Sequence, residues 1–463
     1  MIIIIILLAL AYLALAIYNL EWAVLLLVFA LPSYLIRFTI WHIPSTVLEL
    51  MLLISFVVFF VKDFKARGAS LKTYFNKAKT KRYPFRVEIV LFLLVAYLAL
   101  AVAGFSNDAL GIFKAYFLEA IIFYILYINI FKEESARSKV YWSLAASALI
   151  ISLFGIYQKL SGQFFPTEFL AAERRVTSFF PYPNAVGLYL APIVLLLGGF
   201  IVKLWDERKN KIDLFKISGL SFVVLISLLT IFLAQSEGAL AGIAVAVFAC
   251  ALILNKTSRY IALGCTTVFI IILMISPVAW NYVKTKAMLN DLTGQIRKEQ
   301  WIETKKMFFG SPKIALLGTG LNNYQASVAP YHQAGIFLKN DDPNWLQKIQ
   351  SDPVYRAKAW QPTEIYMYPH NIFLNFWTEL GVLGMLLFVW IFGRFFVESG
   401  KLLAWKNVIT SSDRALLIGL TGAMIVVIIH GLVDVPYFKN DLALLFWLLI
   451  AQLGLFKIKY LKK

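Results

Sequence analysis

The most chemically informative stretch of the sequence is residues 367–384, MYPHNIFLNFWTELGVLG, where a long polar segment meets a long apolar one. Pro369 sets a turn, His370 follows it, and Asn371 can cap a helix that begins there. A histidine side chain has a pKa of about 6.5 and can take a proton from a substrate at neutral pH. A lone histidine at a helix start can also be structural, so its neighbours decide between the two interpretations.

A polar stripe continues from this histidine along the predicted helix. Asn371, Asn375, Thr378 and Glu379 fall at i, i+4, i+7 and i+8, on one helical face. A charge facing lipid at mid-depth would cost about 2.5–3.5 kcal/mol. We therefore expect the stripe to face other helices or a wet cavity, with His370 at the rim of an active site.

Two arginines further upstream are candidates for binding an anion. Arg174 and Arg175 precede Asn184, which we expect to cap the next helix. A helix N-terminus beside guanidinium groups suits a phosphate or diphosphate. The alternative is that both arginines pair only with Glu173 and with lipid phosphates.

A third arginine, Arg297, lies in the motif QIRKEQW, and Trp301 follows one turn later on the same face. The arginine could hold a phosphate while the indole packs against a sugar or a lipid. An isolated arginine on a solvated helix face is the competing interpretation.

Two further polar positions stand at the predicted ends of apolar runs. Glu237 precedes Gly238 and Gly242, whose spacing of four is typical of closely packed membrane helices and leaves the glutamate unexplained. His430 and Asp434 lie one turn apart, and we expect them to form a bonded pair with a structural role.

The sequence predicts neither a cofactor nor a metal. No phosphate-cradling glycine loop, zinc-like cluster or carboxylate-rich constellation is found in it. Cys250 and Cys265 lie inside apolar runs and are expected to be small core residues.

Composition places these residues in a membrane. The chain has 463 residues, 60% of them hydrophobic, and a mean hydropathy of +0.75, whereas a soluble protein averages about 45–50% apolar residues. Apolar runs near the length of a membrane span recur throughout, so we predict an all-α, polytopic bundle of about 12 or 13 spans. The predicted spans cover residues 2–18, 21–36, 44–62, 87–103, 109–131, 140–160, 184–203, 217–234, 238–254, 260–279, 371–393, 414–432 and 441–456.

The net charge of +18 does not indicate nucleic-acid binding, because the cations lie in short loops between apolar runs. Most of the 44 Lys and Arg residues fall on one side, which the positive-inside rule assigns to the cytoplasm, and we expect some of them to contact anionic membrane lipid. The apolar N-terminus has no basic segment before it and is expected to be a retained helix. The basic segments are 62–86, 132–139, 203–216, 256–259, 394–414 and the C-terminal tail.

Alternation of the spans then puts residues 161–183, 235–238, 280–370 and 433–440 outside the cytoplasm. We divide the chain into spans over residues 1–279, an extracytoplasmic subdomain over 280–370, and three last spans with a basic tail over 371–463. The long loop is expected to be partly helical, with Asn290 or Asp291 capping a first helix, and with Asp342 and Asp352 as caps that are each followed by a proline. Loops of this length inside compact structures are usually functional lids or binding segments.

In its layout and in three motifs the chain resembles the O-antigen ligase and O-antigen polymerase superfamily of bacterial membrane glycosyltransferases. The layout of spans and outer loop is similar over most of the chain. The resemblance is sharpest in Arg175-Val176-Thr177 with Pro183-Asn184, in Arg297 and Trp301 with Pro312 and Gly318-Thr319-Gly320, and in His370-Asn371, Leu374, Glu379, Gly381 and Gly384. One departure is Glu237, because many members carry an arginine there.

The resemblance implies a saccharide donor on a polyprenyl diphosphate at the outer face of the bacterial cytoplasmic membrane. Arg297 and Arg175 would hold the diphosphate, and His370 would accept the proton of an acceptor hydroxyl. The acceptor would be a glycan, a lipid or a protein, and transfer would proceed without metal and with inversion. An arginine at this position helps to hold the donor in ligases. With Glu237 there, either the chain does not belong to the ligase subclass, or Arg174 and Arg175 supply the positive charge instead.

Two other classes of protein share this composition. A transporter or flippase of lipid-linked saccharides is also polytopic and basic, but transporters often contain internal repeats and midplane ion sites. The sequence contains no repeat, and its candidate polar residues cluster at the predicted outer rim. A non-catalytic assembly protein would use the outer loop only as a docking surface.

Overall fold

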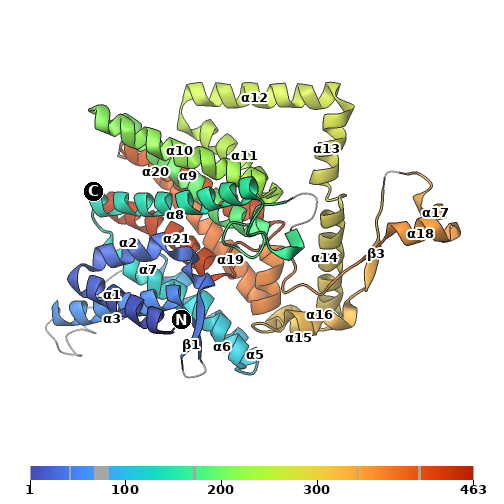
Figure 1. The fold of residues 1–463 in the computed structure, drawn as a ribbon, viewed down its shortest axis with the longest axis horizontal. Coiled ribbons are helices and arrows are strands. Elements are labelled where there is room, and N and C mark those ends of the chain that lie inside the picture. The colour runs from blue at the N-terminus through green and yellow to red at the C-terminus, as the bar shows by residue number, and fades with distance from the viewer. Residues whose placement is uncertain are drawn as a thin grey trace.

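The computed structural model describes residues 2–40, 43–66, 83–169, 174–340, 342–404 and 408–461. Glu173 and most of the predicted basic segment 62–86 therefore lie outside the described residues. The described chain is a helical bundle that carries a long excursion at one end, formed by residues 277–370 (Figure 1). This confirms the predicted all-α polytopic fold.

The first half of the chain builds most of the bundle, and two short antiparallel strands, β1 and β2, pair with Arg37 opposite Thr46. Its elements are α1 (Ile2–Tyr18), α2 (Leu20–Phe29), the 3-10 turn η1 (Leu31–Leu35), β1 (Arg37–Ile40), β2 (Ile43–Thr46), α3 (Val47–Ala66), α5 (Arg86–Val102), α6 (Asn107–Ile112), the π-helix η2 (Phe113–Leu118), α7 (Glu119–Ile130), α8 (Glu134–Ser161), η3 (Thr167–Phe169), α9 (Pro183–Glu207), α10 (Lys211–Leu233) and α11 (Glu237–Leu254).

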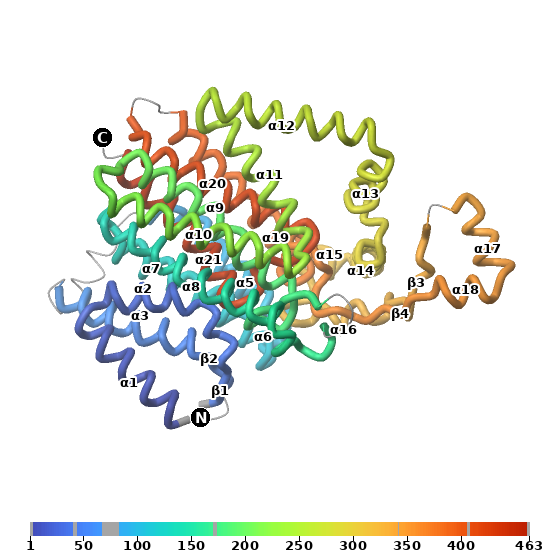
Figure 2. Tube along the Cα trace, turned by 45° about the horizontal axis from the view of Figure 1, so that its top comes forward, coloured from blue at the N-terminus to red at the C-terminus, as the bar shows by residue number. Residues whose placement is uncertain are grey.

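The second half contains the excursion and the last three long helices. Its elements are α12 (Lys256–Ile275), α13 (Pro277–Ala287), α14 (Leu292–Gly310), α15 (Pro312–Leu317), α16 (Tyr324–Val328), η4 (Ala329–Tyr331), β3 (Gly335–Phe337), α17 (Trp345–Ser351), α18 (Pro353–Ala359), β4 (Trp360–Pro362), α19 (Ile372–Ala404), α20 (Ser411–Gly431) and α21 (Asn440–Leu461). The strand pair β3–β4 and helices α17 and α18 form an arm that projects farthest from the bundle (Figure 2).

Nine helices of the described chain are long and apolar enough to cross a membrane. The four other predicted spans coincide with α1, α2, α3 and α5. Helix α2 is the shortest of them, because Pro32 enters a 3-10 turn and the predicted span 21–36 breaks after Phe29. The protein is therefore a multi-pass membrane protein, and among the helices of the predicted spans α2 is the one that is shorter than predicted.

The centre of the bundle consists of α9, α20 and α21, which are mostly buried, whereas α12 has no buried residue. Glycines allow the central helices to approach closely. A methyl group on Gly199 of α9 would lie 2.8 Å from the carbonyl oxygen of Ala415 in α20. Gly242 of α11 packs similarly against Val426 of α20, which confirms the predicted packing role of its motif.

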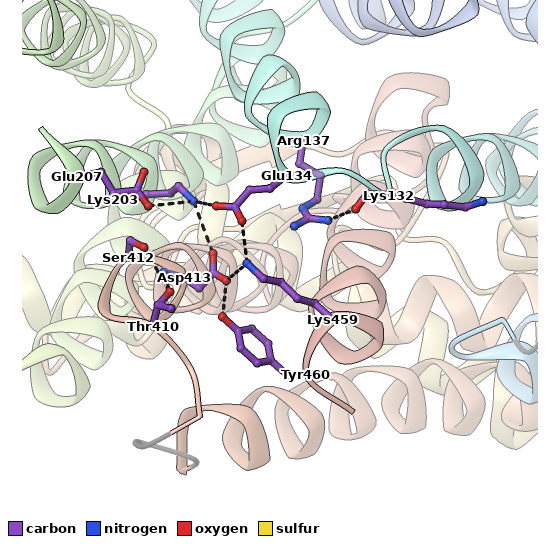
Figure 3. Close-up of polar contacts among 10 residues, drawn as sticks. All are labelled: Lys132, Glu134, Arg137, Lys203, Glu207, Thr410, Ser412, Asp413, Lys459 and Tyr460. Carbon is purple, nitrogen blue, oxygen red and sulfur yellow. Dashed lines mark hydrogen bonds and ion pairs between the residues drawn. The ribbon is translucent and has the colours of Figure 1, made fainter. Parts of the chain in front are cut away.

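At one end of the bundle, four buried or half-buried charges join four helices (Figure 3). Lys203 of α9 pairs with Glu134 of α8 and lies 3.6 Å from Asp413 of α20. Lys459 of α21 lies 2.7 Å from Glu134 and 2.5 Å from Asp413, and Tyr460 donates to the same Asp413 oxygen. The network fixes the starts of α8 and α20 beside the ends of α9 and α21, so the opposite ends of these helices also meet.

Candidate active site

The long excursion is fastened to the start of α19, and this places His370 at the junction. The indole Nε1 of Trp301 in α14 donates to the carbonyl oxygen of Pro369 at 2.8 Å. Asn371 Oδ1 accepts from the backbone N–H groups of Phe373 and Leu374, both at 3.0 Å, which is the predicted cap. Between these two anchors His370 has a φ of +43°, a backbone conformation that non-glycine residues rarely adopt.

The orientation of the His370 ring leaves one nitrogen available for proton transfer. Its Nδ1 lies 3.3 Å from the carbonyl oxygen of Tyr368. Because a carbonyl only accepts, a hydrogen bond there puts the proton on Nδ1 and leaves the Nε2 lone pair free. The ring centroids of Tyr366 and Tyr368 lie 5.1 and 5.0 Å from the centroid of the imidazole.

Arg175 belongs to a chain of hydrogen bonds that crosses the bundle end. Its Nε donates to the carbonyl oxygen of Ala234 at 3.1 Å, and its Nη2 donates to Oδ1 of Asn184 at 3.1 Å. Nδ2 of Asn184 then donates to Oδ2 of Asp434 at 3.2 Å.

The prediction that Asn184 caps a helix is wrong. Helix α9 begins at Pro183, its N-cap residue is Tyr182, and no side chain caps it. Pro183 suits the first helical position, because its fixed φ matches the helix and its missing N–H group would have no partner there. The Asn184 amide is therefore available to bridge Arg175 and Asp434.

Asp434 is the electrostatic centre of the site. Burial raises the pKa of its carboxyl group, but His370, His430, the Val435 N–H group and Lys439 together bring the pKa below its ordinary value. The expected bonded pair with His430 does not form: Asp434 accepts from Asn184 and Val435, and within the described chain Nδ1 of the buried His430 has no partner.

Arg297 approaches the same centre from α14. Burial lowers the pKa of His370, the Asp434 carboxylate opposes this shift, and the Arg297 guanidinium adds to it. Arg297 also interacts electrostatically with His430. Its Nε is buried, and among the described residues it has no hydrogen-bond partner. A buried, unpaired guanidinium nitrogen beside two histidines is suited to an incoming anion.

Three predicted residues lie away from this centre. Arg174 is exposed, and its Nη1 would lie 3.4 Å from a methyl group on Gly162 at the end of α8. Glu237 is exposed and pairs at 2.7 Å with Lys286 of α13. Glu379 accepts at 2.8 Å from the N–H group of Asn322 and so binds the excursion to α19.

Glycines make the docking of the excursion on α19 possible. Gly318 and Gly381 both have positive φ and touch each other through their backbones. The N–H group of Thr319 donates to the carbonyl oxygen of Thr378 at 2.7 Å. Gly318 and Gly381 thus help to position the excursion, whose helix α14 carries Arg297.

Sequence reasoning missed Lys439, Tyr182 and Tyr368. Lys439 donates to the Tyr182 hydroxyl, which lies 3.3 Å from that of Tyr368, whose ring contacts His370. Burial lowers the pKa of Lys439 to about 8, against the opposing effect of Asp441 and Asp434. A signal was present, because Lys439 is a cation in a short segment predicted to lie on the side with few cations.

The bundle end thus combines cations with a half-buried imidazole. No group of three or more His, Cys, Asp or Glu side chains that could hold a metal occurs in the described part of the chain. Arg175, Arg297 and Lys439 can neutralise a polyanion, and Nε2 of His370 can accept a proton beside it.

Comparison with known families bears on this arrangement. Residues 222–389 match the family described as O-Antigen ligase. The matched region contains Arg297, Trp301 and His370, whereas Arg175 and Asp434 lie outside it. No curated protein matches the chain.

Proposed function

Because the chain belongs to the O-antigen ligase superfamily through residues 222–389, we propose that it moves a saccharide from a polyprenyl-diphosphate donor to an acceptor hydroxyl. Membership in this superfamily makes it a membrane glycosyltransferase of the O-antigen ligase or polymerase type. The acceptor would be a glycan, a lipid or a protein.

The donor diphosphate would lie between Arg297 and Arg175. Support comes from the buried Nε of Arg297, which has no hydrogen-bond partner in the described chain, and from the route that links Arg175 through Asn184 to Asp434. Two guanidinium groups can spread their donors over both phosphates and hold the charge that develops on the leaving group. Trp301 would pack against the donor beside Arg297.

His370 would be the general base. Its pKa lies below the ordinary value, so the ring is neutral at pH 7 and Nε2 can take the acceptor proton. The acceptor oxygen forms a bond to the anomeric carbon while the bond from that carbon to the diphosphate breaks. The proton passes to His370, and the electron pair leaves with the diphosphate. This direct displacement inverts the sugar carbon and uses no metal.

We place the reaction at the extracytoplasmic face of the bacterial cytoplasmic membrane. The Lys203 network lies at the opposite end of α8, α9, α20 and α21, among the segments with most Lys and Arg residues. The positive-inside rule assigns that end to the cytoplasm. The active-site end then faces outward, where a lipid-linked saccharide would be presented.

The observation that carries the proposal is the buried Nε of Arg297, which has no partner in the described chain and whose guanidinium, like the Asp434 carboxylate, lies near enough to His370 to shift its pKa. The test is turnover by purified full-length protein with a polyprenyl-diphosphate oligosaccharide and an acceptor glycan. We expect glycan product and free polyprenyl diphosphate in equal amounts. His370→Ala should lower turnover by about 10²–10⁴-fold.

The matched control is His332→Ala, because His332 also lies in the excursion but contacts Glu303 at 3.2 Å instead of the proposed site. This variant should keep near-normal turnover. A folded His370→Ala protein with undiminished turnover would refute the general-base role, and transport of the donor without product would favour a flippase.

A further inference from the structure

A groove of about 570 Å³ lies on the bundle away from the proposed active site, between α8 and the hairpin of α1 and α2. Its walls are almost wholly apolar and include Leu15 of α1, Leu25 and Phe29 of α2, and Trp142 and Ala146 of α8. In a membrane an apolar groove that opens on the protein surface faces acyl chains, and hydrocarbon fills such a space more favourably than water.

The charged residues that line or border the groove in the described chain lie at one end of it. Lys139 of α8 lines it and pairs at 2.7 Å with Glu21, which is in the first turn of α2. The Lys139 ammonium also lies 5.5 Å from the ring of Trp22, an exposed indole on the same helix. An exposed tryptophan beside a charged pair is typical of the level of lipid head groups.

This charged end belongs to the same end of the bundle as the Lys203 network. Lys139 lies little more than one turn after Glu134, a member of that network, on α8. From Trp22 to Phe29, α2 rises about 10 Å, at 1.5 Å per residue, which is roughly a third of the hydrocarbon core of a bilayer. The groove therefore lies within a single leaflet, at the depth of the first part of an acyl chain.

We propose that this groove binds one zwitterionic glycerophospholipid, with an acyl chain between α2 and α8 and its head group on the Glu21–Lys139 pair. The pair uses one of three ammonium donors and one of two carboxylate oxygens within the described chain. Lys139 can donate to the lipid phosphate while Glu21 accepts from the lipid ammonium. Both charges of the head group are then met without breaking the pair.

An anionic phospholipid fits the same place less well. Its phosphate would gain from Lys139 but would face the Glu21 carboxylate, and its head group has no cation to offset this repulsion. The side chains of Lys139 and Glu21 are 43% and 30% exposed, so both reach a head group. The paired charges therefore select for a zwitterion, and the site is independent of the transfer reaction.

The test is native mass spectrometry of the delipidated full-length protein, titrated with phosphatidylethanolamine, phosphatidylcholine or phosphatidylglycerol of identical chains. We expect one molecule of either zwitterionic lipid to bind with a Kd at least tenfold below that of phosphatidylglycerol. Equal binding of the two zwitterions identifies the shared phosphate–ammonium chemistry as the determinant, and a preference for one identifies the ammonium contacts.

Three variants sharpen the assignment. Glu21→Gln should reverse the preference toward phosphatidylglycerol, whereas Lys139→Met should weaken all three lipids. Ala146→Phe should abolish one-to-one binding by filling the groove. The matched control is Asp213→Asn, which removes a carboxylate from an exposed pair with Lys216 at the start of α10, and it should change nothing.

Three results would overturn the proposal: no one-to-one lipid, tighter binding of phosphatidylglycerol by the unaltered protein, or a head-group preference that Glu21→Gln leaves unchanged. The head-group series on the unaltered protein decides the matter even if Ala146→Phe fails to fold.

Discussion

Asn184 and Asp434 are 250 positions apart, yet Nδ2 of Asn184 donates to Oδ2 of Asp434 at 3.2 Å. The same amide accepts from Arg175 through its oxygen. Asn184 therefore connects Arg175, which we propose binds the donor diphosphate, to the Asp434 carboxylate, which acts on His370. This coupling makes the positions of the proposed base and of one proposed anion-binding group depend on each other.

Asn184→Ala tests this coupling. Arg175 keeps its bonds to the carbonyl oxygens of Ala234 and Gln235, so we expect binding of the donor to weaken only moderately. Asp434 loses a hydrogen bond worth roughly 0.5–1.5 kcal/mol, and kcat/KM should fall by about tenfold. Asn255→Ala, which removes the cap of α12, is the control and should leave kcat/KM unchanged. Equal effects of the two variants would contradict the coupling.

Arg297 should not tolerate lysine. A guanidinium presents a planar fork to a phosphate, whereas an ammonium is a point charge. We expect Arg297→Lys to lower kcat/KM for the polyprenyl-diphosphate donor by about 10²-fold, the order of a lost transition-state donor. Arg356→Ala, which removes an arginine stacked on Phe337 in the projecting arm, should have little effect. A fully active Arg297→Lys protein would mean that only net charge is needed at this position.

The pH dependence of turnover should have an acid limb set by His370. The neutral ring is the active form, so activity rises with pH through the pKa of His370, which lies below 6.5. Asp434 raises that pKa, so Asp434→Asn should move the acid limb to lower pH while reducing the plateau. A limb that stays in place or moves to higher pH would show that Asp434 does not act on His370.

The fold was largely predictable, because apolar runs and cation-rich loops report directly on membrane spans. The site was only partly predictable. His370, Arg297 and Arg175 stand beside helix ends or aromatic residues, and these local patterns are visible in a sequence. The bond from Asn184 to Asp434 depends on how α9 and α20 pack, which local sequence does not specify. The same limit explains why the predicted bond between His430 and Asp434 is wrong, whereas the predicted Asn184 cap fails for a local reason, because α9 begins one residue earlier at Pro183.

Gly381 should be intolerant of alanine because of its place against the excursion. Its φ is +74°, and a methyl group there would collide with the carbonyl oxygen of Leu316. Positive φ costs a non-glycine residue about 1–3 kcal/mol before the collision is counted. Gly381→Ala should lower the midpoint temperature of unfolding in detergent and reduce turnover, because the excursion that carries Arg297 docks on α19 at this position. Gly393→Ala, on the same helix with open space around it, should raise the midpoint or leave it unchanged.

Lys203 should be the most important single charge for stability at the opposite end of the bundle. Its side chain is 3% exposed and lies between Glu134 and the buried Asp413. Removing one member of a buried charge network leaves its partners uncompensated, which typically costs about 3–5 kcal/mol. We expect Lys203→Met to lower the free energy of unfolding by that order, measured by titration with a denaturing detergent. Lys216→Met removes an exposed partner of Asp213 at 3.2 Å and should leave the free energy of unfolding nearly unchanged, because solvent screens such a pair. Similar losses in both variants would mean that Lys459 alone neutralises the two carboxylates, and that the helix ends are held together by apolar packing.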